Sequence, residues 1–188
     1  MFSSRKPALL LCAGMIAAGG TLARAAEPGF YGYGDQPTPA QITGWNIDVR
    51  GDDGVGLPPG KGTVQRGSEV YAEQCAACHG IFGEGEGRFP KLVGGAGTLM
   101  DDRPELTVGS YWPFAPTLWD YINRAMPMAA PHTLSADDVY ALTAYILNLN
   151  GIISADGKLD KDTLPKIKMP NRDGFIPEPE FNKITNSK

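Results

Sequence analysis

The chain has 188 residues, of which 42% are hydrophobic, and a formal net charge of −4 at pH 7. The N-terminal 25 residues contain three of the 17 basic residues, so the rest of the chain has 14 basic and 21 acidic residues and a net charge of −7. This negative surplus argues against nucleic acid or an anionic membrane surface as a partner. It suits a solubilising surface, or attraction to a basic patch on another protein.

The first 25 residues have the features of a secretory signal peptide. Arg5 and Lys6 form a basic start, residues 8–18 form an apolar run, and Ala23-Arg24-Ala25 is an A-x-A cleavage site. The apolar run is too short and too rich in small residues for a good membrane span. We therefore expect an exported, periplasmic protein that is cleaved near Ala25 and has no stable membrane insertion.

One domain is expected for the roughly 160 residues that follow the signal peptide at 1–25. Residues 26–63 are rich in Gly, Pro and Asp, which predicts an irregular N-terminal arm. Residues 64–151 have the pattern of a compact helical domain. Residues 152–188 predict an irregular C-terminal arm, because repeated prolines prevent a long helix. These arms either wrap the helical domain or extend toward a partner.

Three helices are predicted, over residues 64–77, 117–126 and 135–149. In the first, Gly67, Tyr71 and Cys75 recur at the spacing of one helical face. Thr117 is the expected N-cap of the second helix. Ser135 is the expected N-cap of the third, with an acidic residue three positions later as in a capping box.

A single C-x-x-C-H motif, Cys75-Ala76-Ala77-Cys78-His79, is typical of covalent attachment of a c-type haem. Two thiols at this spacing reach one edge of a porphyrin and form thioethers with its vinyl groups, and His79 becomes the proximal iron ligand. A redox-active dithiol would need a βαβ frame around the motif, and none is evident. Zinc would need four protein ligands in a structural site or three in a catalytic one, and the candidates are Cys75, Cys78, His79 and His132. Ligation by adjacent residues such as Cys78 and His79 is geometrically awkward.

The chain resembles the class I cytochromes c, in which an N-terminal and a C-terminal helix cross at a glycine between aromatic side chains. Gly67 and Tyr71 on the first helix, and Leu142 and Tyr145 on the last, match that pattern. A glycine suits a close crossing because it has no Cβ. Ordinary amphipathic packing would tolerate the same residues. The resemblance implies an all-α fold, a cytochrome c-like helical haem domain with irregular N- and C-terminal arms.

A second match to this family follows the motif, in Arg88-Phe89-Pro90-Lys91-Leu92. In class I cytochromes c, a proline at this offset presents its carbonyl to the haem histidine, and a leucine two positions later packs against the haem. The resemblance implies these roles for Pro90 and Leu92. A carbonyl acceptor would fix the tautomer of His79 and raise its basicity. Alternatively, Pro90 only ends a loop.

The segment Met126-Pro127-Met128 resembles the M-P segment before the last helix of many bacterial cytochromes c. The resemblance implies that Met126 is the sixth iron ligand, and a thioether there raises the reduction potential relative to a second histidine. Met128, Met100, His132 or an open coordination position remain alternatives. A methionine at a helix end is also common as a core residue.

Arginines and aromatic donors are expected to contact the haem propionates, since buried carboxylates need hydrogen-bond donors. The candidates are Arg88, Arg103, Trp112 and Tyr111. The glycine-rich stretches at 83–87 and 94–97 lack the strand and the Gly-Lys-Ser/Thr of a phosphate-binding loop. We interpret them as loop segments that curl around a porphyrin.

Five strings resemble a narrower group, the cytochrome subunit of Sox sulfane dehydrogenase and cytochromes that serve molybdenum sulfite dehydrogenases. They are Asn46–Arg50, Gly56–Gly60, Val108–Pro113, Leu118–Ile122 and Met169–Phe175. The Sox subunit usually has a second haem domain, whereas this chain has one C-x-x-C-H motif, so a one-haem branch or service to a different molybdoenzyme remains open.

This narrower resemblance implies a non-catalytic electron-transfer subunit with one covalent haem c. It would accept electrons from a molybdopterin-containing sulfite or sulfane dehydrogenase during sulfur-compound oxidation. It would pass them to a downstream cytochrome c or oxidase of the respiratory chain. Two other functions remain open: a general periplasmic shuttle with no dedicated partner, and an enzyme that acts at an open haem site.

Overall fold

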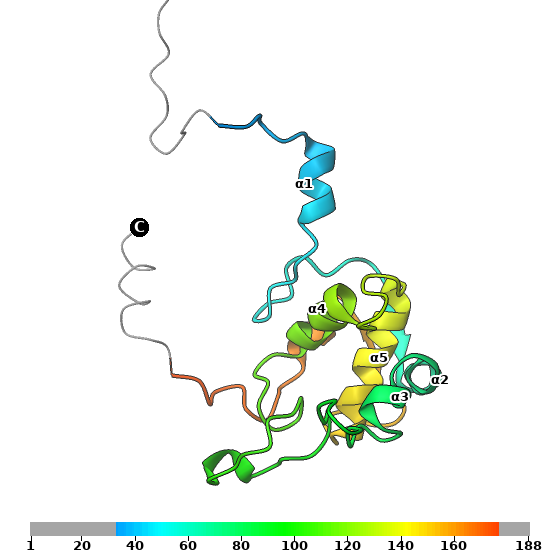
Figure 1. The fold of residues 1–188 in the computed structure, drawn as a ribbon, viewed down its shortest axis with the longest axis vertical. Helices are drawn as coiled ribbons and strands as arrows, with labels where there is room; N and C mark the ends of the chain where they lie inside the picture. Colours follow the sequence, from blue (N-terminus) through cyan, green and yellow to red (C-terminus); the bar gives the residue numbers. More distant parts are fainter. Residues whose placement is uncertain (1–32, 177–188) are drawn as a thin grey trace, which may run out of the picture. The chain divides into compact units, whose positions relative to one another are not determined.

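The computed structural model describes residues 33–176 (Figure 1), so the predicted signal peptide lies outside the described residues. The chain divides into two units, Met1–Thr38 and Pro39–Lys188, and the second contains every helix and strand described below. Between residues 33 and 176, no helix is long and apolar enough to cross a membrane.

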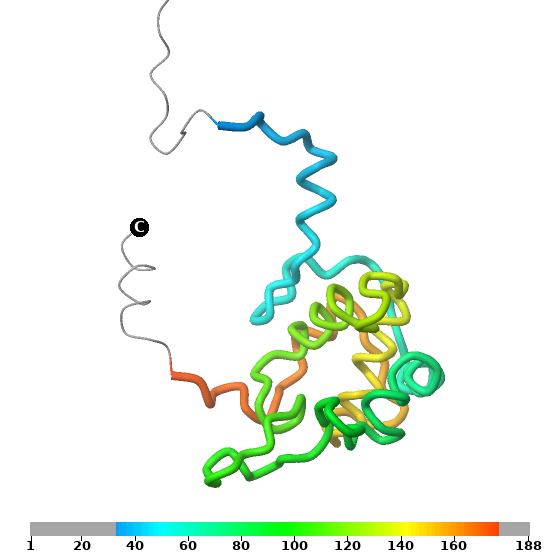
Figure 2. The backbone as a smooth tube through the Cα atoms, viewed as in Figure 1, coloured from blue at the N-terminus to red at the C-terminus, as the bar shows by residue number. Residues whose placement is uncertain are grey.

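The second unit is mainly helical, as the sequence predicts. Its elements are α1 (Pro39–Trp45), β1 (Lys61–Thr63), α2 (Val64–Gln74), α3 (Ala76–His79), the 3₁₀ turn η1 (Thr98–Met100), α4 (Ala115–Ala125), α5 (Ala136–Leu149), β2 (Lys158–Asp160) and the 3₁₀ turn η2 (Leu164–Lys166). Between α3 and α4 the chain follows a long, largely irregular path (Figure 2).

The helix starts follow local capping chemistry. The Ser135 side chain accepts a hydrogen bond from the Asp138 backbone N–H and caps α5 as predicted. The predicted start of α4 at Thr117 is wrong. The helix begins at Ala115 and contains Pro116 in its first turn, where proline costs little because its missing N–H would be unpaired.

The predicted first helix is divided in two at Cys75. Helix α2 ends at Gln74, and Cys75 takes φ −123° and ψ −38°, away from regular helical values. The short helix α3 then continues from Ala76 to His79. The attachment motif therefore lies on its own helical turn rather than on the last turn of α2.

Helices α2 and α5 cross where the sequence predicts, and Figure 1 shows α2 nearly end-on beside α5. A Cβ built on Gly67 would lie 2.0 Å from the Ala141 carbonyl oxygen, so only glycine permits this approach. The Tyr71 and Tyr145 rings lie beside the crossing with centroids 5.2 Å apart, and Leu142 is fully buried. The class I arrangement of these side chains is confirmed.

The two arms meet in a small antiparallel sheet that the sequence analysis missed. Strand β1 pairs with β2, and Gly62 lies opposite Leu159. A Cβ on Gly62 would be 2.0 Å from the Ala141 backbone nitrogen, so the strand lies directly against α5. Glycine in a strand marks such a close backbone approach.

Both arms contribute to the hydrophobic core. Val49 precedes the sheet, and Leu159, Leu164 and Met169 lie in or after its second strand, and all four are buried with residues of α2, α4 and α5. By contrast, none of the residues of α1 is buried. Parts of both arms therefore pack against the helical domain, whereas α1 remains exposed.

Candidate haem site

The attachment motif presents two free thiols on one short turn. Cys75 joins α2 to α3, and Cys78 and His79 lie on α3, whose turn is closed by hydrogen bonds from both of their backbone N–H groups to the Cys75 carbonyl (3.1 and 2.9 Å). Cys75 is half-buried, as is His79 at the end of the turn. The turn thus holds two thiols and an imidazole together, at a partly covered surface.

The environment of Cys75 does not favour a redox-active dithiol. Burial, and secondarily the neighbouring Cys78, raise the pKa of the Cys75 thiol to about 11. Reactive dithiols instead have a lowered thiol pKa, because the thiolate is the nucleophile. The raised pKa of Cys75 therefore gives no support to thiol–disulfide exchange at this motif.

The imidazole of His79 is oriented by Pro90. The Nδ1 atom lies 3.0 Å from the Pro90 carbonyl oxygen. Since a carbonyl only accepts hydrogen bonds, this contact favours the neutral tautomer that has its proton on Nδ1 and its free lone pair on Nε2. This is the arrangement that metal-ligating histidines use, and it leaves Nε2 available for iron.

The loop that follows His79, residues 80–85, is held by hydrogen bonds to the motif and to α2. The Tyr71 hydroxyl donates to the Gly80 carbonyl at 3.0 Å, and the Gly85 N–H donates to the His79 carbonyl at 2.7 Å. The Glu84 carboxylate accepts from the Phe82 N–H at 2.7 Å, and local backbone N–H groups, its own first, lower the pKa of Glu84. These contacts fix the chain that leads from the motif to Pro90.

Leu92 and Trp112 are placed against the core. The Leu92 side chain is half-buried, and its N–H donates to the Gly83 carbonyl at 2.8 Å. The Trp112 ring meets the Tyr121 ring edge to face, with centroids 5.8 Å apart. Both residues lie at partly covered positions, and their contact with haem stays a prediction.

The two arginines proposed as propionate donors are exposed. The Arg88 guanidinium lies 5.4 Å from the centroid of the Phe89 ring, and Arg103 is on the irregular path before α4. The backbone carbonyl of Tyr111 accepts a hydrogen bond from Asn171 at 2.7 Å. No described contact assigns these residues to a haem, so their roles also stay predictions.

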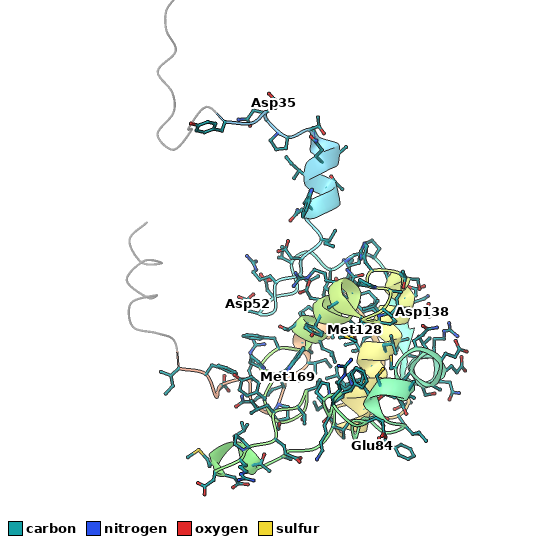
Figure 3. All side chains as sticks on the ribbon, viewed as in Figure 1. Asp35, Asp52, Glu84, Met128, Asp138 and Met169 are labelled. Carbon is teal, nitrogen blue, oxygen red and sulfur yellow. The ribbon has the colours of Figure 1, made fainter. Side chains whose placement is uncertain are left out.

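The methionines differ in burial. Met126 is the C-cap of α4, is partly buried and packs against the hydrophobic core. Met128, labelled in Figure 3, is 62% exposed, and Met100 is 94% exposed. His132 is exposed as well, with Nδ1 3.4 Å from the Asn123 carbonyl oxygen. A sixth iron ligand must be shielded from water, so this pattern favours Met126.

These groups together fit a haem c. The chain offers two free thiols, an imidazole with an available Nε2 and a partly buried thioether. These are the functional groups that hold a six-coordinate haem with thioether attachment. Over the described range 33–176, no group of three or more His, Cys, Asp or Glu residues is placed to hold a metal ion.

One buried polar residue of the same region was missed by the sequence analysis. Asp120 on α4 is only 6% exposed, yet its carboxylate is fully engaged with the backbone of Val49 and the side chain of Arg124. Its position on the helix offers only a weak signal, a charge beside an otherwise apolar stripe, and its partner Val49 is 71 residues away. No local pattern indicates such a contact.

The fold and the motif define a c-type cytochrome, and comparisons with known proteins agree. Residues 64–150 match the family described as "Cytochrome c". The cytochrome c-554(547) of Halothiobacillus neapolitanus is 32% identical over 93 residues, which are 47% of this chain and 98% of that protein. The chain belongs to the cytochrome c family, which implies covalently bound haem c.

Two further similarities extend beyond the small cytochromes. The crystal structure of the sulfane dehydrogenase SoxCD from Paracoccus pantotrophus matches with a TM-score of 0.74 and 40% identity, covering 85% of this chain and 79% of that chain. The thiosulfate dehydrogenase of Stutzerimonas stutzeri (strain A1501) is 29% identical over 109 residues, 55% of this chain. The chain spans only 33% of the length of that enzyme.

Proposed function

We propose that this chain is a periplasmic electron-transfer subunit with one covalent haem c. In this proposal it accepts electrons from a molybdenum-containing sulfane or sulfite dehydrogenase and passes them to a downstream cytochrome c or oxidase. The observation that carries the proposal is the 40% identity to a chain of sulfane dehydrogenase SoxCD over 85% of this chain. That similarity extends well beyond the residues that match the cytochrome c family.

The proposed attachment uses the groups described above. Cys75 and Cys78 would hold the haem through thioethers, and His79 and Met126 would ligate its iron. Bound haem supplies a one-electron Fe(III)/Fe(II) couple. The Pro90 carbonyl raises the basicity of His79, and the Met126 thioether favours the reduced state relative to a second histidine. If His79 and Met126 both ligate the iron, this chain would transfer electrons, and the oxidation of the sulfur compound would take place in its partner.

A two-electron oxidation in the partner requires this chain to accept one electron twice. The haem must therefore be reoxidised between the two transfers, and the partner must either stay bound to this chain or rebind it quickly. The net charge of −7 expected after signal-peptide cleavage favours a partner with a basic patch, because opposite charge accelerates encounter. The exposed helix α1, which includes Trp45 at 87% exposure, adds an apolar surface beyond the haem domain.

The first test is copurification. A tagged form of the full chain is isolated from the periplasm during growth on reduced sulfur compounds, and the preparation is assayed for molybdenum and for sulfite- or sulfane-dependent haem reduction. We expect a molybdoenzyme to copurify and substrate to reduce the haem. Two results together would contradict the proposal of a dedicated partner. The haem-loaded chain would copurify with no molybdenum, and substrate would fail to reduce its haem even after periplasmic extract is added.

A second test concerns the haem itself. The intact mass of the exported protein should equal the processed polypeptide plus one haem. Cys78→Ala should remove one thioether, which shifts the reduced absorption maximum of the alkaline pyridine derivative. A colourless protein with the mass of the bare polypeptide would exclude electron transfer through haem as the function of this chain.

A general periplasmic shuttle is the second candidate. It is favoured by the similarity to cytochrome c-554(547), because that relative is matched over 98% of its own length by 93 residues of this chain. A shuttle would reduce several purified acceptors at similar rates and would not copurify with a molybdoenzyme. An enzyme acting at an open haem would instead bind carbon monoxide readily in the reduced wild-type protein.

A further inference from the structure

The carboxylate of Asp120 is a buried charge with two kinds of partner. The Val49 N–H donates to Oδ1 at 2.9 Å, and the Arg124 Nε–H lies 3.0 Å from both carboxylate oxygens. The Arg124 Nη2 also donates to Oδ2. A buried carboxylate is tolerated only when its oxygens are satisfied in this way. Asp120 therefore links a backbone amide of the N-terminal arm to a side chain one helical turn further along α4.

On the arm side, the chain around Val49 is held firmly. Val49 is 8% exposed and belongs to the hydrophobic core. A Cβ on Gly51 would lie 2.6 Å from the Thr117 hydroxyl, so the arm touches the first turn of α4. The following turn is closed by the Arg50 N–H, which donates to the Val55 carbonyl at 2.8 Å. The arm is thus packed along α4, with the Asp120 contact as its polar anchor.

On the other side, Arg124 lies two residues before Met126. The Met126 N–H makes the last hydrogen bond of this helix, to the Ile122 carbonyl at 3.0 Å. The Asp120–Arg124 pair spans the same turn at the i, i+4 spacing that stabilises helices. The last turn of α4 is therefore clamped where the chain turns off toward the methionine.

We propose that Asp120 is a positioning residue, which ties the N-terminal arm to the last turn of α4 and thereby holds the Met126 thioether at the iron. This inference rests on Met126 being the sixth ligand, as in the proposed function. It makes the arm part of the haem site as well as a surface extension. Displacing Val49 from Asp120 leaves the buried carboxylate without one of its hydrogen-bond donors and loosens the turn that leads to Met126.

The test uses the haem-loaded full chain in the ferric state and cyanide as the probe. Cyanide binds only after methionine has left the iron, so its binding rate reports how often the Met126 segment opens. In Asp120→Asn, one side-chain oxygen remains for the Val49 N–H but the charge that holds Arg124 is lost. We expect cyanide to bind about tenfold faster, equivalent to about 1.4 kcal/mol of lost ligand restraint. The methionine-to-iron charge-transfer band should weaken in parallel.

A matched pair at position 49 isolates the arm. Val49→Pro removes the backbone N–H that Asp120 accepts, whereas Val49→Ala keeps it and trims the side chain. We expect Val49→Pro to accelerate cyanide binding and Val49→Ala to leave the rate near that of the wild type. Equal rates for the two variants would show that the amide bond does not restrain the ligand and would overturn the link to the arm.

Two controls separate positioning from general destabilisation. Arg66→Gln breaks an ion pair with Asp138 (3.0 Å) between α2 and α5, and should lower the urea midpoint without changing the cyanide rate. Arg124→Gln removes the clamp from the exposed side and carries the test if Asp120→Asn does not fold. The inference is overturned if folded Asp120→Asn binds cyanide at the wild-type rate. If Asp120→Asn does not fold, a wild-type rate in folded Arg124→Gln overturns it.

The failure of this inference is distinguishable from failure of the proposed ligand. If Met126→Ala keeps the charge-transfer band, another residue is the ligand, and both the assignment of Met126 and the positioning role of Asp120 are wrong. If Met126→Ala abolishes the band while Asp120→Asn retains the wild-type band and cyanide rate, the ligand stands and only the positioning role is wrong.

Discussion

At the scale of single residues, polar groups in this chain are used mainly to fix backbone positions. Pro90 orients His79, Tyr71 holds the carbonyl of Gly80, and Asp120 receives the amide of Val49. In each case one side of the hydrogen bond is a backbone group. Such contacts pin loops and arms, which have few repeating hydrogen bonds of their own, to the helices that carry the candidate ligands.

The turn of the N-terminal arm has an ion pair with a predictable pH response. Hydrogen bonding by Arg50 is the largest of the influences that hold the pKa of Asp53 at about 2, against an ordinary value of 3.8. Because the folded-state pKa is the lower one, the stabilisation is present above about 3.8 and is lost as the pH falls toward about 2. Asp53→Asn should lack this part of the acid sensitivity.

The measurement for Asp53 is the urea midpoint at neutral pH and at a pH between about 2 and 3.8, with wild type and variant side by side. Because both side chains are exposed, the neutral-pH difference should be small. Asp52→Asn is the matched control, since Asp52 is a more distant neighbour of Arg50 at 3.4 Å. An Asp53→Asn midpoint that falls with acid as steeply as the wild-type midpoint would contradict the prediction.

At the scale of elements, the crossing of α2 and α5 is the contact that most strongly constrains the chain. Gly67→Ala would improve the intrinsic helix propensity of α2 by up to about 1 kcal/mol. The added Cβ would nevertheless meet the Ala141 carbonyl oxygen at 2.0 Å, and the Ala141 carbonyl carbon at 2.6 Å. Backbone atoms cannot rotate away, so the helices must separate.

We therefore expect Gly67→Ala to reduce the free energy of unfolding by about 2–3 kcal/mol, as overpacking of a tight contact does. Chemical denaturation followed by far-UV circular dichroism measures this change. Gln65→Ala, an exposed position on the same helix, should leave stability nearly unchanged. Unaltered stability in Gly67→Ala would mean that the two helices are not in close contact in solution.

The elements also show what the sequence could predict. The helix cap at Ser135 and the glycine crossing at Gly67 are recognisable because their chemistry is local or follows helical spacing. The pairing of β1 with β2 is not recognisable, since each strand has three residues and too few positions for an alternating pattern. The candidate ligands were located from a five-residue motif and an M-P segment, whereas Asp120 was missed because its partner is distant in sequence.

At the scale of the whole molecule, the C-terminal segment belongs to the structural core. Met169, labelled in Figure 3, is 1% exposed and lies in the same hydrophobic cluster as residues of α2, α4 and α5. Met169→Ala should cost about 2–5 kcal/mol of unfolding free energy, the range for truncating a large buried side chain. Met128→Ala, at a 62% exposed position, should be nearly neutral and is the matched control. Equal stabilities for the two variants, measured by urea titration, would place residue 169 outside the core.

The net charge of the molecule leads to a prediction about its partner. The full chain has a net charge of −4, which would become −7 after the proposed signal-peptide cleavage near Ala25. An acidic chain that meets a basic docking patch should associate more slowly as ionic strength rises, because salt screens charges beyond about 8–10 Å. Stopped-flow reduction of the haem by the copurified dehydrogenase should then slow steeply with added sodium chloride. Reduction by a small neutral reductant should change little, which controls for effects of salt on the haem itself. A reaction with the partner whose rate does not depend on salt would indicate docking through apolar contacts, for which the exposed side chains of α1 offer one surface.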